Sequence, residues 1–266
     1  MPPADHSATL RSRIDAILRS FCGDDPGRSV AFRGYRPELA LQSVRGDVAR
    51  PAASVMKIAL AMAVFDGARR GVIDLEQRVA VRSFTATRYV SILAGFDPGH
   101  MLTVREICRL ALITSDNPLA VFLQGLAGFD SVNRLLAEAG CRPPSEMAAG
   151  FTEDDLGPKN RASVFTAEAV LRLIDVLRSD PHYADLVLAL KNNLRNNRIP
   201  ALLPEHVTVI HKTGSLEGVA NDAGLVEDGQ VEFAVAFLSD HQADTARTSS
   251  GMASCSLALY ELLGAH

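Results

Sequence analysis

The feature that most constrains the fold is the order in which two hydrophobic periodicities follow each other along the 266 residues. Apolar residues that recur every three to four positions predict amphipathic helices at both ends of the chain and through a long middle segment. Two intervening regions, near residues 29–44 and 207–238, carry strand-like patterns that predict hairpins. Predicted helices cover residues 8–21, begin near residues 54, 103, 118, 130, 166 and 183, and return in the C-terminal stretch.

This order of elements favours an α+β fold. Strands from the two flanks would combine into one antiparallel sheet flanked by the terminal helices, and the middle would pack as a second, all-helical lobe. We therefore expect a single unit over residues 1–266. Its α/β lobe covers about 1–52 and 201–266, and its all-α lobe covers about 53–200.

Three helix starts carry local capping signals. Thr103 and Glu106 match the capping-box pattern, in which the threonine and glutamate side chains satisfy each other's backbone N–H groups. Pro118 suits the first position of a helix, which makes Asn117 the expected cap. Asp130 is the expected cap of the helix that follows.

Composition restricts the class of protein. The net charge is −4, so general affinity for nucleic acid is not expected. No apolar run of about 18 residues is present and the N-terminus lacks an apolar h-region, so we expect no membrane span and a cytoplasmic protein, or a periplasmic or secreted one if an upstream segment is missing. The four cysteines lack metal-type spacing and read as free thiols. We expect a monomer with no metal, cofactor or macromolecular partner, acting on a small molecule.

A serine and a lysine lie at the head of the most apolar predicted helix. Ser54 and Lys57 are separated by three positions, so they share one side of a helix, near its positive end. A hydroxyl beside an amine in this setting is an activated nucleophile in outline. Taken alone, the pattern is better explained by a serine cap with a surface lysine, because four-residue patterns of common residues often arise by chance.

Two further short patterns occur downstream. Ser115-Asp116-Asn117 lies on a predicted turn between two helices, and Lys212-Thr213-Gly214 ends a predicted strand. Each alone is explained by a helix cap or a strand end. Asp116 reads as structural in either interpretation. His211 precedes Lys212 on the strand, so its side chain is expected on the opposite face.

These three motifs, S-x-x-K, S-D-N and K-T-G, occur together in the order found in penicillin-recognising serine enzymes. The chain resembles the class A serine β-lactamase family, including relatives known only as serine hydrolases. The resemblance covers nearly the whole chain and extends to Gly218 and to Asn221-Asp222. It implies an α/β lobe and an all-α lobe with the site between them.

The resemblance also implies a role for each motif residue. Ser54 would attack an amide or ester carbonyl, Lys57 would accept its proton, and Ser115 would relay a proton to the leaving nitrogen. Asn117 would hold Lys57 and bind the amide of the substrate. The substrate carboxylate would contact three residues of the third motif, namely Lys212, Thr213 and Ser215. The backbone N–H groups of Ser54 and Ser215 would form the oxyanion hole.

The match weakens in the loop that supplies the deacylating glutamate, which the family carries as E-x-x-L-N. Glu153 heads an E-x-x-L stretch here, but Gly157 stands where the asparagine belongs. Phe151 occupies the place of an arginine that normally clamps the loop. Glu153 is therefore either the catalytic carboxylate of a looser loop or a surface charge. Acylation should survive, whereas deacylation should be weakened.

Three functions follow from these observations. The first is a β-lactamase-like serine hydrolase, and the second is a cytoplasmic esterase, amidase or acyltransferase that acts on a small metabolite. The third is a non-catalytic ligand-binding relative, which the intact Ser54 and Lys57 pair disfavours. A cell-wall peptidase is disfavoured by the missing export signal. Resemblance in fold does not fix the substrate.

Overall fold

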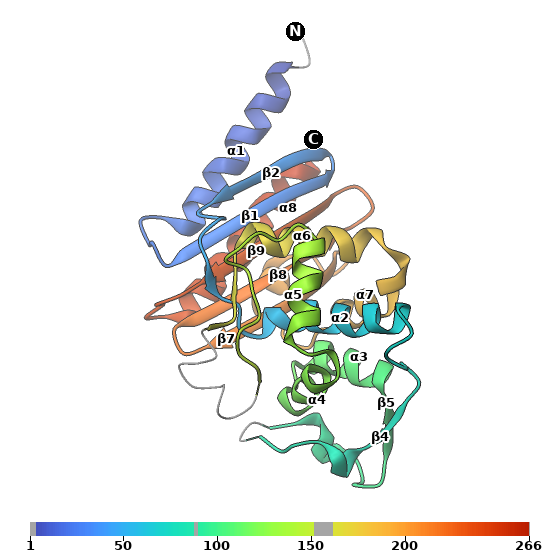
Figure 1. Cartoon of the computed structure of the whole chain (residues 1–266). Helices are drawn as coiled ribbons and strands as arrows, with labels where there is room; N and C mark the ends of the chain where they lie inside the picture. The colour runs from blue at the N-terminus through green and yellow to red at the C-terminus, as the bar shows by residue number, and fades with distance from the viewer. Residues whose placement is uncertain (1–3, 88–89, 152–161, 266) are drawn as a thin grey trace.

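The computed structural model describes residues 4–87, 90–151 and 162–265 (Figure 1). The N-terminal part contains α1 (Ala4–Cys22), β1 (Arg28–Arg36), β2 (Glu38–Val44) and β3 (Arg50–Pro51). The middle contains η1 (Ala53–Met56), α2 (Lys57–Arg69), β4 (Arg78–Ala80), η2 (Val81–Ser83), η3 (Ile92–Gly95), β5 (Met101–Thr103), α3 (Val104–Thr114), α4 (Asn117–Ala127), α5 (Phe129–Glu138), β6 (Val164–Phe165), α6 (Ala167–Ser179), η5 (Pro181–Tyr183) and α7 (Ala184–Lys191). The C-terminal part contains η6 (Ile199–Leu202), β7 (Thr208–Leu216), β8 (Val219–Glu227), β9 (Glu232–Ser239) and α8 (Thr245–Gly264).

The main sheet joins the two ends of the chain. Its five strands run in the order β2-β1-β9-β8-β7, and each neighbouring pair is antiparallel. The pairing of β1 with β9 brings together residues far apart in the sequence, since Val30 lies opposite Phe237. The predicted α+β architecture with one antiparallel sheet is confirmed. Both predicted hairpins are present, with strands longer than the sequence pattern indicated.

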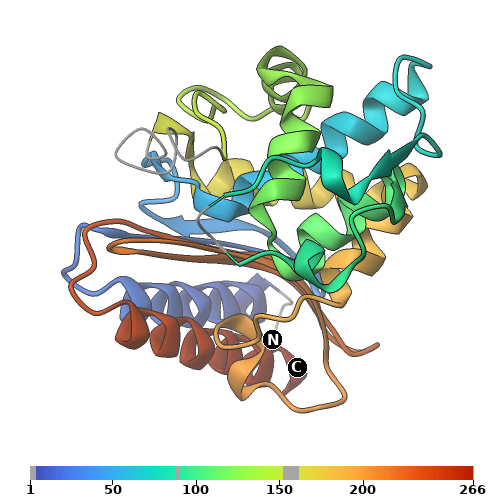
Figure 2. The same cartoon turned by 90° about the horizontal axis from the view of Figure 1, so that it is seen from below.

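Helices cover both faces of this sheet (Figure 2). The face with the larger side chains, including Phe32, Val235 and Phe237, packs against α1 and α8. The opposite face presents smaller residues such as Ala31 and Ala236 toward α2 and α6. Because successive side chains of a strand point to opposite faces, this alternation of large and small residues fixes which helices lie on each side.

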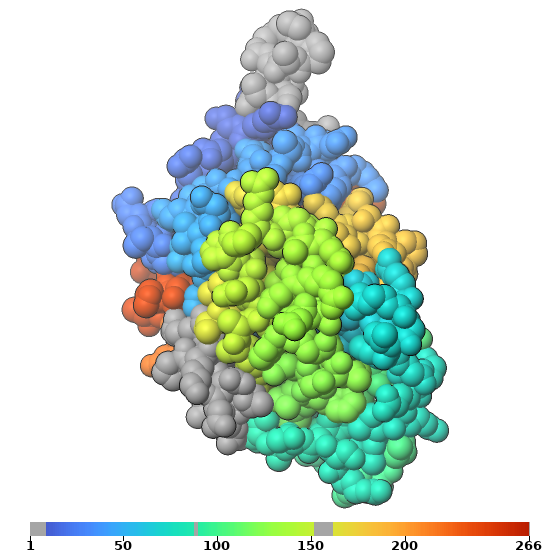
Figure 3. Space-filling model, viewed as in Figure 1, coloured from blue at the N-terminus to red at the C-terminus, as the bar shows by residue number. Residues whose placement is uncertain are grey.

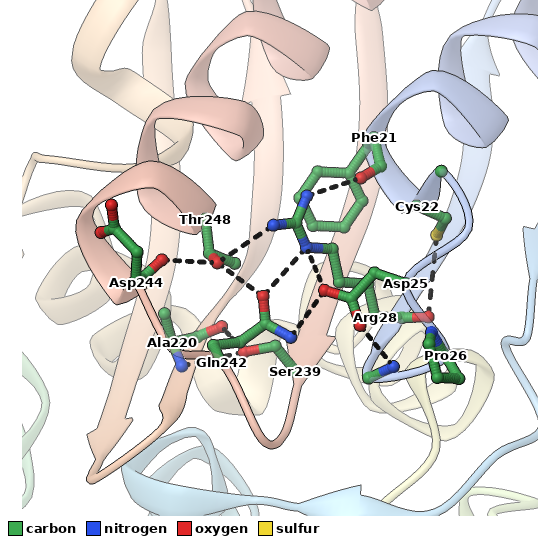
Figure 4. Close-up of polar contacts among 12 residues, drawn as sticks. Phe21, Cys22, Asp25, Pro26, Arg28, Ala220, Ser239, Gln242, Asp244 and Thr248 are labelled. Atoms are coloured by element: carbon green, nitrogen blue, oxygen red, sulfur yellow. Dashed lines mark hydrogen bonds and ion pairs between the residues drawn. The ribbon is translucent and has the colours of Figure 1, made fainter.

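A polar network fastens the N-terminal segment to the C-terminal helix (Figure 4). Arg28, at the start of β1, donates from Nε to Gln242 Oε1 at 3.0 Å and from Nη1 to the carbonyl of Phe21 at 3.1 Å. The Gln242 amide donates to Asp25 Oδ2 at 3.0 Å, and the Thr248 hydroxyl donates to Gln242 Oε1 at 2.7 Å. These hydrogen bonds fix the end of α1 relative to the start of α8 on one face of the sheet.

The all-helical lobe is built around α2. Ten of its thirteen residues are buried, which agrees with a helix that is apolar on nearly all sides. It packs against α4 and α5, and α5 forms part of the outer surface of the lobe (Figure 3). A salt bridge of 2.7 Å between Arg33 of β1 and Asp175 of α6 links this lobe to the sheet.

Several local predictions are tested by the helix ends. The capping box of Thr103 and Glu106 is present. The prediction that Asn117 caps α4 is wrong, because Asp116 is the cap and accepts a hydrogen bond from Leu119 N at 3.1 Å. The prediction for Asp130 is also wrong, since α5 begins directly after Gly128. Within the described residues, no helix is long and apolar enough to cross a bilayer.

Candidate active site

Ser54 lies in a single 3₁₀ turn, η1, that runs directly into α2. It is therefore one turn ahead of the α-helix rather than in its first turn, which corrects the sequence prediction. The preceding residue, Ala53, has a φ of +48°, a left-handed conformation that an alanine adopts only under constraint. The serine is half-buried, whereas its neighbours Ala53 and Val55 are buried.

The constraint on this turn comes from two distant segments. Ala52 donates its N–H to the carbonyl of Ser163 at 2.9 Å. Asn221, which is fully buried in β8, donates from Nδ2 to the carbonyl of Pro51 at 2.8 Å and accepts from Ser239 N at 2.7 Å. The backbone leading to Ser54 is thus anchored to β8 of the main sheet on one side and to the residue before β6 on the other.

Lys57 sits beside Ser54 on α2. Its Nζ lies 2.9 Å from Ser54 Oγ, 3.0 Å from the carbonyl oxygen of Ser115 and 2.8 Å from Asn117 Oδ1. Burial of the side chain, only 1 % exposed, lowers the pKa of Lys57 from its ordinary 10.5 to about 7. Desolvation is the main cause, because it disfavours the charged amine more than the nearby Asp116 carboxylate favours it.

The second motif forms the turn between α3 and α4. Ser115 ends α3 in the left-handed conformation with φ at 63°, and its side chain is half-buried. Asp116 caps α4 and also accepts from Ile92 N at 2.9 Å, which ties the 91–95 segment to the turn. Because Asp116 takes the capping role, the Asn117 side chain is available to contact Lys57.

The third motif lies inside β7, which continues to Leu216, and not at the end of the strand as predicted. Lys212 is fully buried and donates from Nζ to the carbonyl of Thr213 at 3.0 Å. Burial, reinforced by the positive charge of Lys57, holds the pKa of Lys212 well below its usual range. The two lysines are therefore close enough to repel each other.

Gly214 permits the close approach of β7 to the nucleophile. A Cβ atom at this position would lie 3.0 Å from both Ala53 Cβ and Ser54 N, and 3.1 Å from the carbonyl oxygen of Ala52. These separations are too tight for a side chain to be accommodated freely. The strand backbone beside Ser215 is thus held against the backbone of Ser54.

Arg198 is a buried residue of this region that the sequence patterns did not indicate. It donates from Nη2 to Ser215 Oγ at 2.6 Å, from Nη1 to the carbonyl of Gly214 at 2.8 Å and to the carbonyl of Asn221. Because the Ser215 oxygen accepts from Arg198, the proton of its hydroxyl is free to point outward. No motif marks this arginine, since it reaches the site only through folding.

His211 lies on the other face of β7, as expected for a neighbour of Lys212. Its Nδ1 is 2.9 Å from Asp222 Oδ1, and its Nε2 is 3.1 Å from Asn196 Oδ1. Asp222 also accepts from Ile199 N at 3.1 Å. This buried group anchors the segment that carries Arg198 to β7 and β8.

The ring of Phe151 lies beside Lys57. The Lys57 ammonium lies 4.6 Å from the centroid of the Phe151 ring. Phe151 N donates to Gln124 Oε1 at 3.2 Å, and Gly150 leaves no room for a Cβ beside the same amide. The apolar ring therefore contributes to the desolvation of Lys57. Glu153 lies outside the described residues.

Comparison with known proteins identifies the family. The sequence profile of the β-lactamase enzyme family matches residues 9–263. The chain belongs to the β-lactamase enzyme family. The predicted resemblance to class A β-lactamases is thereby confirmed, and with it a place among β-lactamase-like serine hydrolases. No curated protein matches the chain significantly.

Solved structures of β-lactamases share the fold. A β-lactamase from Sphaerobacter thermophilus superposes with a TM-score of 0.84 at 22 % identity, over 96 % of this chain and 97 % of its own. A class A β-lactamase from Bacteroides cellulosilyticus gives 0.83 at 23 %, over 97 % and 99 %. PBP-A gives 0.81 at 20 %, over 97 % of each chain. At these identities the likeness to these β-lactamases and to PBP-A concerns the fold alone.

Within the described ranges, no group of three metal-ligating side chains comes together. The polar groups around Ser54 are instead those of amines, hydroxyls and amides. The site as built can supply a nucleophile, a neutral amine base and hydrogen-bond donors, which is the set of groups used in acyl transfer.

Proposed function

We propose that this protein is a serine hydrolase that a β-lactam, or a related amide or ester, acylates at Ser54, and that release of the acyl group is slow. The observation that supports acylation is the set of three partners around Lys57 Nζ. Ser115 O and Asn117 Oδ1 can only accept hydrogen bonds, whereas Ser54 Oγ can also donate one.

A neutral amine has two N–H donors and one lone pair. If the two donors bond Ser115 O and Asn117 Oδ1, the lone pair points at the Ser54 hydroxyl and can take its proton. A pKa of about 7 makes this neutral form abundant near neutral pH. In the proposed step, Ser54 Oγ bonds the carbonyl carbon, its proton moves to Lys57, and the resulting oxyanion accepts from the N–H groups of Ser54 and Ser215.

Collapse of the tetrahedral intermediate breaks the carbon–nitrogen bond of the amide. The leaving nitrogen takes a proton from the Ser115 hydroxyl, which is replenished from Lys57. In this proposal Asn117 positions Lys57 and the amide of the donor, while Lys212, Thr213 and Ser215 bind its carboxylate. The approach of Gly214 to Ser54 N supports the oxyanion hole, where each donor lost costs roughly 3–4 kcal/mol in a well-studied hydrolase.

The test of acylation is intact-mass spectrometry after incubation with benzylpenicillin and with a chromogenic ester. We expect an adduct of the mass of the intact donor for the penicillin, mapped to Ser54 by peptide digestion. The Ser54→Ala variant should show none. Absence of both adduct and turnover in the native protein, with the same result for Ser54→Ala, would favour the non-catalytic binding relative.

Slow deacylation is supported by Phe151, whose apolar ring lies against Lys57. An apolar ring cannot orient a hydrolytic water. A mutant of PBP-A, which shares the fold, is described as an acyl-enzyme complex with penicillin G. A long-lived acyl group could be passed to another acceptor, so an acyltransferase, esterase or amidase on a small metabolite is the second candidate.

Deacylation is tested by following the lifetime of the adduct after excess donor is removed. We expect the adduct to persist over many minutes. Glu153→Gln should lower turnover by no more than about twofold. Rapid multiple-turnover hydrolysis that Glu153→Gln abolishes would reject slow deacylation and make Glu153 the general base. Faster loss of the adduct on addition of small amines or alcohols would favour the acyltransferase.

A further inference from the structure

A cavity of about 600 Å³ lies at the β2 edge of the main sheet, and three arginines contribute to its lining. Arg11 comes from α1, Arg33 from β1 and Arg178 from α6. Because α1 and α6 cover opposite faces of the sheet (Figure 2), the cavity extends past the sheet edge from one face to the other. Its volume is within the roughly 300–1,000 Å³ of small-molecule sites. It shares no lining residue with the three motifs.

Two of these arginines are oriented by carboxylates of the protein. Arg33 and Tyr35 are two positions apart on β1, so their side chains leave the same face of the strand, and both reach Asp175 of α6. Arg33 donates from Nη1 to Asp175 Oδ2 at 2.7 Å, and Arg178 donates from Nε to Glu232. Neither carboxylate is among the described residues that line the cavity. The carboxylates therefore orient the two arginines without filling the cavity.

The ring of Tyr35 brings the same two guanidinium groups together. Arg178 Cζ lies 4.2 Å from the ring centroid, and Arg33 Cζ lies 5.7 Å from it. A guanidinium has five N–H donors, and each of these arginines donates one nitrogen to its carboxylate. Across the residues that the structure describes, their other nitrogens have no acceptor. Two sets of charged donors are thus available around one ring.

Arg11 adds a third guanidinium, which has no ion pair with any described residue. Glu38 is the one carboxylate in the described lining, and it is likewise unpaired within the described ranges. The lining therefore carries three positive charges and one negative charge. A guanidinium matches phosphate because its planar group donates two parallel hydrogen bonds to two oxygens. A ligand with at least two negative charges would balance the excess.

We propose that this cavity binds a diphosphate group, either free or carried by a nucleoside. Arg33 and Arg178 would each contact one phosphate, and Arg11 would contact the ligand from α1. The carboxylate of Glu38 would oppose binding and so restrict the site to ligands with more than one negative charge. The cavity is separate from Ser54, so this inference is independent of the proposed function.

The test is isothermal titration calorimetry of the full chain with pyrophosphate at constant ionic strength. We expect a dissociation constant below about 1 mM. Arg11→Gln should weaken binding at least about fivefold, because charge-assisted hydrogen bonds are lost. Glu38→Gln should tighten it at least about threefold, because the opposing charge is removed. A purely structural role of the two side chains would not produce these opposite shifts.

The matched control is Arg70→Gln, which removes an exposed arginine just after α2 and should change the affinity by less than about 1.5-fold. Adenosine diphosphate distinguishes the two sources of the ligand. Binding as tight as that of pyrophosphate, or tighter, favours a nucleoside diphosphate, and weaker binding favours free diphosphate. No binding of either ligand up to about 10 mM would overturn the inference. Equal effects of Arg11→Gln and Arg70→Gln, or no tightening in Glu38→Gln, would overturn it as well.

Discussion

The pH dependence of acylation follows directly from the surroundings of Lys57. With a pKa of about 7, roughly 9 % of the amine is neutral at pH 6 and roughly 91 % at pH 8. If the neutral amine accepts the Ser54 proton, the second-order rate constant for acylation should rise about tenfold over this interval and then level off. An amine with its ordinary pKa of 10.5 would give about a hundredfold rise without a plateau.

The perturbation that tests this assignment is Asn117→Asp. It places a carboxylate where an amide oxygen now lies 2.8 Å from Lys57 Nζ. An adjacent negative charge favours the ammonium form, so the midpoint of the profile should move up by about 1–3 units. The midpoint is the relevant quantity because Asn117 is also proposed to touch the donor, which would alter the rate at every pH.

The assay is stopped-flow or quenched-flow mass spectrometry of adduct formation with benzylpenicillin between pH 5.5 and 9.5. Gln230→Glu is the matched control, because it adds the same charge in the exposed turn after β8, beyond the end of the strand, which lies roughly 20 Å from Asn221. Its midpoint should stay near 7. A profile without inflection in the native protein, or a midpoint that Asn117→Asp does not raise, refutes the assignment of Lys57 as the base.

Three further predictions address the framework of the site. Gly214→Ala should slow acylation at least about tenfold while the protein stays folded by circular dichroism, because the added methyl would lie 3.0 Å from Ser54 N; an unchanged rate would contradict the close approach. The depressed pKa of Lys57 means that the unfolded chain binds more protons between pH 7 and 10.5, so stability contributed by this group should rise with pH, by about 2 kcal/mol from pH 7 to 9. The gain is measured by denaturant unfolding of the native protein and of Lys57→Met at several pH values. If the free energy of unfolding changes with pH to the same extent in both proteins, the prediction is wrong. Asn221→Ala should lower the free energy of unfolding by about 2–4 kcal/mol, because it leaves two buried backbone groups without their hydrogen-bond partner. Asn192→Ala on the surface should lower it by less than about 0.5 kcal/mol. Equal losses of stability for the two variants in chemical denaturation would count against the anchoring role of Asn221.

The sequence predicted the elements of the fold because the relevant signals are local. Hydrophobic periodicity gave the helical middle and both hairpins, and the capping box of Thr103 and Glu106 depends only on residues one turn apart. The cap of α4 was assigned wrongly because Asp116 and Asn117 are both good caps by type. Burial of the turn and the second hydrogen bond of Asp116 to Ile92 N decide between them.

The sequence also supplied the motif residues and, through their order, the family, since these are properties of residue type and spacing alone. It could not supply the partners of Lys57, the bonds from Arg198 to the third motif, or the ring of Phe151 beside the amine. Those contacts join segments far apart in the chain, so only the packed structure brings them within a few ångströms. The pKa of Lys57 was decided in the same way, because desolvation depends on everything that surrounds a side chain and not on its neighbours in sequence.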